Sequence, residues 1–183
     1  MKTTISSRWQ AVVLLLLVPF AVFATGGAEA ETVEPEEQIL RVGLRQLTTI
    51  DPALGANDPE VLFNRLQYDY LIEILPDGSL QPSLATDWEI SDDGLTYTFR
   101  LQPNVTFEDG SSFDAEDVVH SFERLVSEGS SIVSLLGANE DGSATWTVEA
   151  ADELTAVFTL ERPNADFLYG VASRFALILS SES

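Results

Sequence analysis

The residues with the most obvious capacity for chemistry are three pairs of adjacent carboxylates, at positions 92–93, 108–109 and 116–117. Paired carboxylates can act as general acid and base in glycoside hydrolysis, provided that the two groups lie about 5 to 10 Å apart. Neighbouring residues on a strand or in a turn point away from each other, so no pair alone sets that separation. We therefore interpret the pairs as turn and helix-cap residues.

Metal chemistry and nucleophilic chemistry have little support in the composition. His120 is the only histidine and cysteine is absent, so paired-histidine metal motifs, zinc-thiolate sites and a Ser-His-Asp triad cannot be assembled. We expect His120 to be a partly exposed residue beside an apolar helical stripe. Residues 139–143 offer oxygen ligands without the spacing of an EF-hand loop, which favours an ordinary hairpin turn. We expect no catalytic residue, no metal and no cofactor.

Common nucleotide-binding and hydrolase motifs are also missing. The chain contains no G-x-G-x-x-G, G-x-x-x-x-G-K or G-x-S-x-G pattern, and its single lysine is Lys2. Residues 104–106 fit a glycosylation sequon, which we interpret as part of a loop. The sequence therefore disfavours the usual enzyme classes.

The chain is strongly acidic, with 30 aspartates and glutamates against 9 lysines and arginines and a formal net charge of −21. Without residues 1–30 it has seven arginines and 29 acidic residues, which is a net charge of −22. Binding to nucleic acid or to anionic lipid needs cations on the protein, so neither partner is expected. Solubility through self-repulsion and adaptation to high salt both explain the acidity, and composition does not separate them.

Residues 1–30 have the pattern of an export signal. Lys2 and Arg8 provide a positive start, residues 11–24 form an apolar run, and small residues follow. Fourteen apolar residues fall short of the about 20 that a membrane-spanning helix needs. We predict a cleaved signal peptide at residues 1–30, followed by an acidic linker at residues 31–38.

The cleavage point and the compartment are linked predictions. Cleavage after Ala24 and cleavage after Ala30 both fit the small-residue pattern. Because the chain has no cysteine, lipid attachment through a cysteine at the cleavage site is excluded. We expect a periplasmic or secreted protein with no stable membrane insertion after signal cleavage.

The first ordered elements are a strand and a helix. Apolar residues alternate at residues 39–44, which predicts a strand, and Asp51 with Pro52 indicates a turn. From Pro59 the apolar residues recur at helical spacing. This pattern predicts a helix that continues to Ile74 and stops at the Pro-Asp-Gly sequence of residues 76–78.

Two hairpins and a second helix follow. Strict alternation at residues 95–101 predicts a strand paired with residues 88–90, and the same pattern pairs residues 146–148 with residues 154–160. Between the hairpins, residues 115–126 carry a complete apolar stripe at helical spacing. Asp114 is placed to cap this helix, which should end near Gly129. Hairpins separated from helices predict an α+β domain.

Several short motifs occur in a fixed order in this region. Trp88 precedes the sequence S-D-D-G-L-T-Y-T-F at residues 91–99, then V-T-F-E-D-G at 105–110 and A-E-D-V-V-H-S at 115–121. Residues 158–165 read F-T-L-E-R-P-N-A. This series resembles the family 5 extracellular solute-binding proteins, which are the oligopeptide, dipeptide and nickel receptors of bacterial ABC importers. The resemblance extends over about residues 40–179.

The resemblance implies a two-lobed periplasmic binding protein of the type II kind, of which this chain would be an amino-terminal fragment. Residues 39–58 would form the first strand and loop of lobe one, residues 59–162 an extra subdomain, and residues 163–183 a return into lobe one. The second lobe would be missing, and with it most of the ligand cleft. We therefore expect a truncated receptor that does not bind solute on its own.

The resemblance also implies ligand-contacting residues and partners. Leu47, Thr48 and Thr49 would belong to the cleft-facing loop after the first strand, although plain turn residues explain them equally. The complete receptor would bind a peptide or small solute and meet ABC permease subunits, and the chain should be a monomer. Two alternatives stay open: a self-sufficient small secreted binding or scaffold domain, and a secreted hydrolase that uses Asp93 or Glu116.

Overall fold

The computed structural model describes residues 43, 46–54 and 57–182. The predicted signal peptide and acidic linker lie outside the described residues, as does the predicted first strand apart from Gly43. The described elements all belong to one compact unit, residues 42–183.

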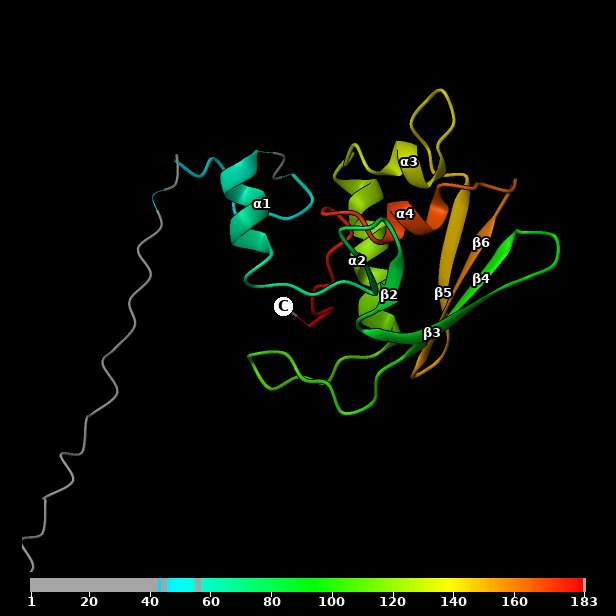
Figure 1. Ribbon diagram of the computed structural model, residues 1–183, viewed down its shortest axis with the longest axis horizontal. Helices are drawn as coiled ribbons and strands as arrows, with labels where there is room; N and C mark the ends of the chain where they lie inside the picture. Colours follow the sequence, from blue (N-terminus) through cyan, green and yellow to red (C-terminus); the bar gives the residue numbers. More distant parts are fainter. Residues whose placement is uncertain (1–42, 44–45, 55–56, 183) are drawn as a thin grey trace, which may run out of the picture. The chain divides into compact units, whose positions relative to one another are not determined.

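The centre of this unit is a four-stranded antiparallel sheet with strand order β3-β4-β6-β5 (Figure 1). Its strands are β3 (Ala85–Ile90), β4 (Thr96–Leu101), β5 (Trp146–Asp152) and β6 (Thr155–Leu160). Both predicted hairpins are confirmed, since β3 pairs with β4 and β5 pairs with β6. The hairpins join through β4 and β6, which places Phe99 opposite Ala156.

The two inner strands follow the alternation that predicted them. In β4 and β6 every second residue is buried and packs on the core side of the sheet. The buried set is Tyr97, Phe99, Leu101, Ala156, Phe158 and Leu160. Phe158 lies at the centre of this core, with its ring 4.8 Å from that of Phe122 and 5.6 Å from that of Phe99, measured between centroids.

The two outer strands are less regular. The register of β3 shifts between Ala85 and Asp87, and the register of β5 shifts between Ala150 and Asp152. Each shift marks a bulge-like irregularity, which bends a strand and increases its twist. The exposed carboxylates on these strands are Asp87, Glu89, Glu149 and Asp152.

Helix α2 (Ala115–Ser127) confirms the predicted apolar stripe and cap. The side chain of Asp114 accepts hydrogen bonds from the backbone N–H groups of Glu116 and Asp117, and the side chain of Asp117 accepts one from the N–H of Asp114. This reciprocal pair satisfies N–H groups that a helix start leaves free. Gly129 follows the helix with a φ of 65°, which ends it where predicted. The buried stripe is Ala115, Val118, Phe122 and Leu125.

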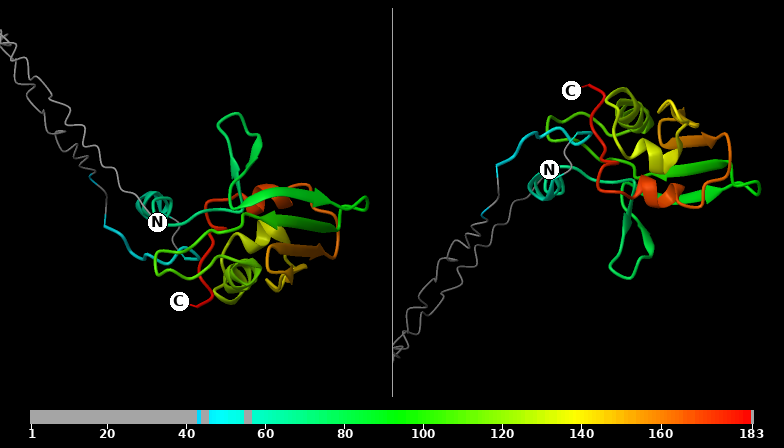
Figure 2. Two further views of the ribbon diagram at one scale, coloured as in Figure 1. Left: turned by 90° about the horizontal axis from the view of Figure 1, so that it is seen from below. Right: turned by 90° about the horizontal axis from the view of Figure 1, so that it is seen from above.

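The predicted helix from Pro59 to Ile74 is wrong beyond its first two turns. Helix α1 (Asp58–Asn64) ends at Asn64, residues 65–67 form a turn, and strand β1 (Ile72–Ile74) begins at Ile72. Strand β1 pairs with β2 (Leu80–Pro82), so residues 76–78 form a hairpin turn rather than a helix stop. Figure 2 shows this hairpin projecting away from the four-stranded sheet.

The physical reason for the correction lies in long-range pairing. Tyr70 forms an antiparallel bridge with Leu177, and its carbonyl accepts a hydrogen bond from the N–H of Leu84. Leu71 and Ile72 are both completely buried, because an extended segment packed on both faces hides consecutive side chains. Apolar residues in such a run satisfy helical spacing by chance.

Two short helices complete the unit, and neither was predicted. Helix α3 (Val133–Gly137) follows α2, and α4 (Phe167–Val171) follows β6. They pack closely, since a Cβ placed on Gly170 would lie 2.8 Å from Cδ2 of Leu136. The following residues 176–178 are also buried, so the segment after β6 belongs to the core.

Candidate functional site

The predicted ligand loop is attached to α1 through a buried carboxylate. Glu60 lies in the first turn of α1 and is only 1% exposed. Its Oε1 accepts a hydrogen bond from the backbone N–H of Thr48 at 3.0 Å and another from the Thr48 hydroxyl. Its Oε2 accepts the N–H of Asn57 at 2.9 Å. The position of Thr48 is therefore fixed by a residue twelve positions away.

These hydrogen bonds also set the charge state of Glu60. The hydroxyl of Thr48 and then the N–H groups of Asn57 and Thr48 lower the pKa of Glu60 to about 2, against an ordinary value of 4.5. Hydrogen bonds to the ionised form outweigh burial, which acts in the opposite direction. Glu60 is therefore a buried anion at neutral pH.

A second attachment connects the same loop to α2. Both carboxylate oxygens of Asp51 accept hydrogen bonds from Arg124, with Nη1 to Oδ1 at 2.8 Å and Nη2 to Oδ2 at 2.5 Å. The side chains of this ion pair are each 25% exposed. Asp51 Oδ1 also accepts the N–H of Ala53, and the N–H of Asp51 donates to the hydroxyl of Thr49. The hydrogen bond from Arg124 is the main cause of the lowered pKa of Asp51.

The loop at residues 47–51 is thus held at both ends. Between the attachments, Leu47 and Thr49 are half-buried and Thr48 is exposed. The family resemblance predicts these three residues as ligand contacts, but sequence reasoning did not include Glu60 and Arg124, which hold the loop in place. A carboxylate in a first helical turn is commonly explained by the helix dipole, so the sequence held no sign of its bonds to Thr48.

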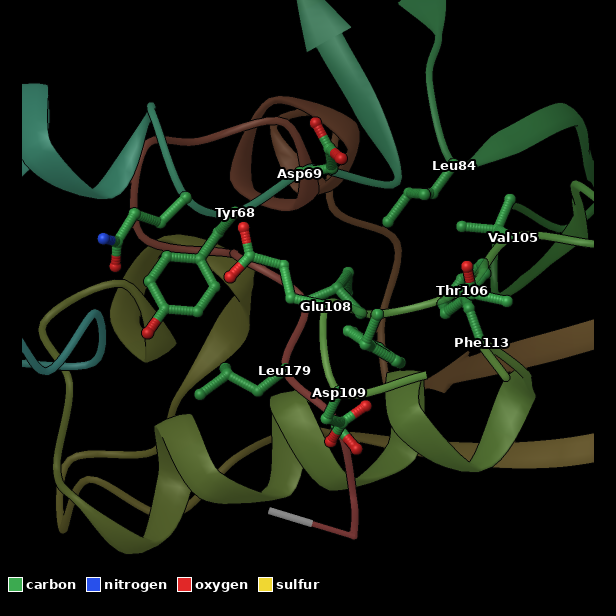
Figure 3. A pocket seen from close by; sticks show the side chains of 13 residues that line it. Tyr68, Asp69, Leu84, Val105, Thr106, Glu108, Asp109, Phe113 and Leu179 are labelled. Atoms are coloured by element: carbon green, nitrogen blue, oxygen red, sulfur yellow. The ribbon is translucent and has the colours of Figure 1, made fainter. Parts of the chain in front are cut away.

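A cavity of about 520 Å³ lies elsewhere in the unit (Figure 3). It is formed by the segment after α1, the loop before α2 and the last described residues of the chain. Its walls combine apolar side chains with the carboxylates of Asp69, Glu108 and Asp109, and no lysine or arginine lines it. A cavity of this composition disfavours an anionic ligand.

This cavity is indicated only indirectly by the sequence. Residues 105–110 are one of the family motifs, yet the cavity also needs residues 67–69, 84 and 178–180, which are distant along the chain. The carboxylate of Asp109 is hydrogen-bonded within its own turn, because its Oδ1 accepts hydrogen bonds from the N–H and hydroxyl of Ser111. These two bonds lower the pKa of Asp109.

The remaining candidates have the structural roles predicted for them. Asp93 Oδ1 accepts the hydroxyl of Ser91 and the N–H of Leu95, which places it in the β3–β4 turn. Glu116 is exposed in the first turn of α2, and His120 is half-buried on the same helix. Residues 139–143 form a turn closed by a hydrogen bond from the N–H of Asn139 to the carbonyl of Ser143.

Two kinds of feature are absent from the described residues. Among them, no group of three or more histidines, aspartates or glutamates is arranged to hold a metal ion. In the same part of the chain, no helix has the length and apolar character required to cross a membrane.

Solved structures with this fold are periplasmic binding proteins. One is the ABC transporter-associated periplasmic binding protein DppA from Helicobacter pylori in complex with the peptide STSA, with a TM-score of 0.60, 33% identity, and coverage of 73% of this chain and 29% of that chain. Another is the Escherichia coli murein tripeptide binding protein MppA, with a TM-score of 0.62, 28% identity, and coverage of 74% and 29%. The fold is that of a partial α+β domain of a type II periplasmic binding protein.

The sequence comparison is more specific. Residues 79–182 match the model described as bacterial extracellular solute-binding proteins, family 5 Middle. The chain therefore belongs to the family 5 bacterial extracellular solute-binding proteins, which confirms the resemblance found in its motifs.

Curated relatives are also similar to the chain and are longer than it. The probable D,D-dipeptide-binding periplasmic protein DdpA of E. coli K12 is 31% identical over 185 residues, covering 98% of this chain and 33% of the relative. The dipeptide-binding protein of E. coli K12 is 36% identical over 114 residues, covering 55% and 21%. The chain thus spans a third or less of the length of these relatives.

Proposed function

We propose that this chain is part of the solute-binding receptor of an ABC-type importer for peptides or related small solutes. The family match and the relatives named for dipeptide and murein peptide binding support this proposal. The export signal predicted at residues 1–30 agrees with a periplasmic or secreted location. The named relatives are binding proteins, and we propose a binding role without enzymatic activity here too.

The observation that carries the site assignment is the doubly anchored loop at residues 47–51. Ligand contacts need backbone and side chains held in position before the ligand arrives. Glu60 and Arg124 provide that rigidity from two different helices. We assign Leu47, Thr48 and Thr49 to one wall of the solute cleft.

The domain assignment follows the same reasoning. We place residues 39–58 in lobe one, residues 59–162 in an extra subdomain, and residues 163–183 in a return into lobe one. Several apolar side chains are exposed on the loop at residues 47–54, on α1 and just after α1. Such exposure supports the proposal that these side chains contact other parts of a longer receptor, of the kind found in the relatives. They are Ile50, Leu54, Leu62 and Leu66, with exposures from 42% to 79%.

A chimera tests the assigned wall. Residues 43–182 would replace the aligned segment of E. coli DdpA, whose alignment covers 98% of this chain, and affinity for D,D-dipeptides would be measured by calorimetry. Leu47→Ala should weaken binding roughly tenfold, because a half-buried leucine would lose its contact with the ligand. Ile90→Ala, which truncates a 48% exposed aliphatic residue on β3, is the matched control. Equal affinities for both variants would contradict the assignment.

The chain by itself provides a second test. With one wall only, we expect no peptide to bind more tightly than about 1 mM, which corresponds to roughly −4 kcal/mol. Titration of the purified chain with dipeptides and tripeptides in a calorimeter measures this directly. A micromolar dissociation constant would favour the alternative of a self-sufficient binding domain. We propose that the chain is monomeric and that permease subunits engage only the complete receptor.

A further inference from the structure

A second, smaller cavity of about 270 Å³ collects donor groups from three segments. Arg65 follows α1, Tyr70 and Glu73 come from the segment leading into and through β1, and Ser173 and Arg174 follow α4. The cavity shares no lining residue with the loop at residues 47–51 or with the larger cavity. It is therefore a separate feature of the molecule.

Tyr70 is the buried anchor of this cavity. The residue is 6% exposed, and its O–H finds no acceptor within the described part of the chain, although Arg65 lies close enough to donate to the hydroxyl oxygen. Its backbone is fixed by the bridge to Leu177 and by the N–H of Leu84. A buried hydroxyl without a partner is costly, so a ligand that accepts its proton would gain a hydrogen bond at little reorganisation cost.

The charged groups around Tyr70 indicate the chemical class of this ligand. Burial raises the pKa of Tyr70, and the nearby guanidinium of Arg65 opposes that effect without reversing it, so the phenol keeps its proton. A guanidinium has donors only, and it leaves the O–H of the phenol free to donate. Arg65, Tyr70 and Arg174 together offer donors to an acceptor-only group, which is the property of an oxyanion.

Neither arginine is neutralised by an ion pair among the described residues, whereas Arg100 and Arg124 both form one. The Arg174 guanidinium lies 4.9 Å from the centre of the Phe175 ring, on its face. Two arginines that line one cavity without an ion pair are unexpected in a chain of net charge −21, which offers many carboxylates as partners. Their position beside the Tyr70 hydroxyl is explained if they receive an anion.

The acidic neighbours limit the charge of that anion. Glu73 also lines the cavity, and its Oε2 accepts a hydrogen bond from Nε2 of Gln81 at 2.9 Å. Two guanidinium groups and one carboxylate leave one positive charge, which matches a monoanion better than a phosphate dianion. Ile74 and Ala172 provide an apolar wall for a short alkyl group.

We propose that this cavity binds the carboxylate of a small organic acid or of a peptide end, with the Tyr70 hydroxyl, Arg65 and Arg174 as its donors. The site is independent of the solute cleft, so its test does not depend on the receptor function. Glu73 lines the same cavity, and its negative charge repels an anionic ligand. Glu73→Gln should therefore tighten carboxylate binding severalfold.

The experiment is an NMR titration of the full chain with propionate, and with propionamide as the uncharged control. We expect saturable shifts for propionate with a dissociation constant of about 1 mM, and none for propionamide. Tyr70→Phe should weaken binding roughly tenfold, because it removes one hydrogen bond to a charged acceptor and keeps the ring. Tyr68→Phe is the matched control, since Tyr68 lines the larger cavity.

The results that would overturn the proposal differ from those that it predicts. Equal shifts with propionate and propionamide, or unchanged affinity in Tyr70→Phe with an intact amide spectrum, would overturn the proposal. Arg65→Gln and Arg174→Gln should each weaken binding, while Arg162→Gln should leave it unchanged. A dipeptide and its carboxy-terminal amide then identify the source: binding of the free dipeptide at about 1 mM that is lost in the amide indicates a peptide end, whereas a site that binds propionate and neither form of the dipeptide indicates a small organic acid.

Discussion

At the scale of single residues, Glu60 combines burial with a full charge. Its three hydrogen bonds come from Thr48 and Asn57 rather than from a cation. Glu60→Gln should keep the size of the side chain but lose acceptor strength at one oxygen. We expect faster hydrogen exchange at the Thr48 amide, measured by NMR. Glu116→Gln, on an exposed carboxylate, is the control, and equal exchange rates in both variants would contradict the assigned role.

The pH dependence of stability follows from the same residue. The folded-state pKa of Glu60 is about 2, below its ordinary value of 4.5. The stabilisation from Glu60 is therefore fully present above pH 4.5 and is lost as the pH falls toward 2. Urea unfolding between these limits should show a steeper loss of stability in the parent chain than in Glu60→Gln. Parallel curves would mean that Glu60 titrates normally.

The ion pair of Arg124 and Asp51 gives a prediction about geometry. Arg124→Lys keeps the charge but cannot form two parallel hydrogen bonds with one carboxylate. Because both side chains are three-quarters buried, we expect a loss of about 1 to 2 kcal/mol in the free energy of unfolding. Arg100→Lys is the control, since its pairs with Asp87 and Glu89 are exposed. An equal loss in the free energy of unfolding for Arg100→Lys would contradict the prediction that the buried ion pair contributes more than the exposed one.

At the scale of elements, the start of α2 is set by Asp114. Asp114→Ala removes the acceptor for two backbone N–H groups and should lower the free energy of unfolding by about 1 kcal/mol. Asp114→Asn keeps a side-chain oxygen at the cap and should lose only a small part of that stability. Urea unfolding followed by the fluorescence of Trp146, which packs on Phe122 of α2, measures both variants. Identical midpoints for the two variants would be inconsistent with capping.

The elements that sequence analysis predicted correctly are those encoded locally. The β3–β4 and β5–β6 hairpins and α2 each contain their own alternation, turn or cap. By contrast, the extended segment at Tyr70 depends on Leu177 and Leu84 for its neighbours, and α3 and α4 depend on each other. Tertiary pairing of this kind leaves no periodic signal in a single sequence.

The candidate site divides in the same way. The motif series indicated the family. Because motifs in a fixed order allow positions of the family to be matched to this sequence, it also predicted Leu47, Thr48 and Thr49. Glu60 and Arg124 reach that loop from residues 12 and 73 positions away, and no pattern in the sequence relates them. The cavity that contains Tyr70 is not predictable from the sequence either, since the apolar spacing predicts that this tyrosine lies in a helix.

At the scale of the whole molecule, the net charge of −21 should make stability depend on salt. Sodium chloride screens repulsion between surface carboxylates, so we expect the melting temperature to rise with salt. A rise that stops near about 0.1 M would match simple solubility, whereas a rise that continues to about 1 M would favour adaptation to high salt. The effect should shrink at pH 4, where carboxylates begin to be protonated. A melting temperature independent of salt would contradict this account.

The irregular outer strands have a further consequence. Strands at the edge of a sheet expose unpaired backbone groups, which invite other molecules to extend the sheet into fibres. In this chain β3 and β5 each combine a register shift with exposed carboxylates, such as Glu89 and Glu149. Two copies that approached each other along β5 would bring like charges together on bent strands, whereas the carboxylates of β3 are paired with Arg100. Resistance to fibrous aggregation is thus built into the sheet, and it should weaken in acid.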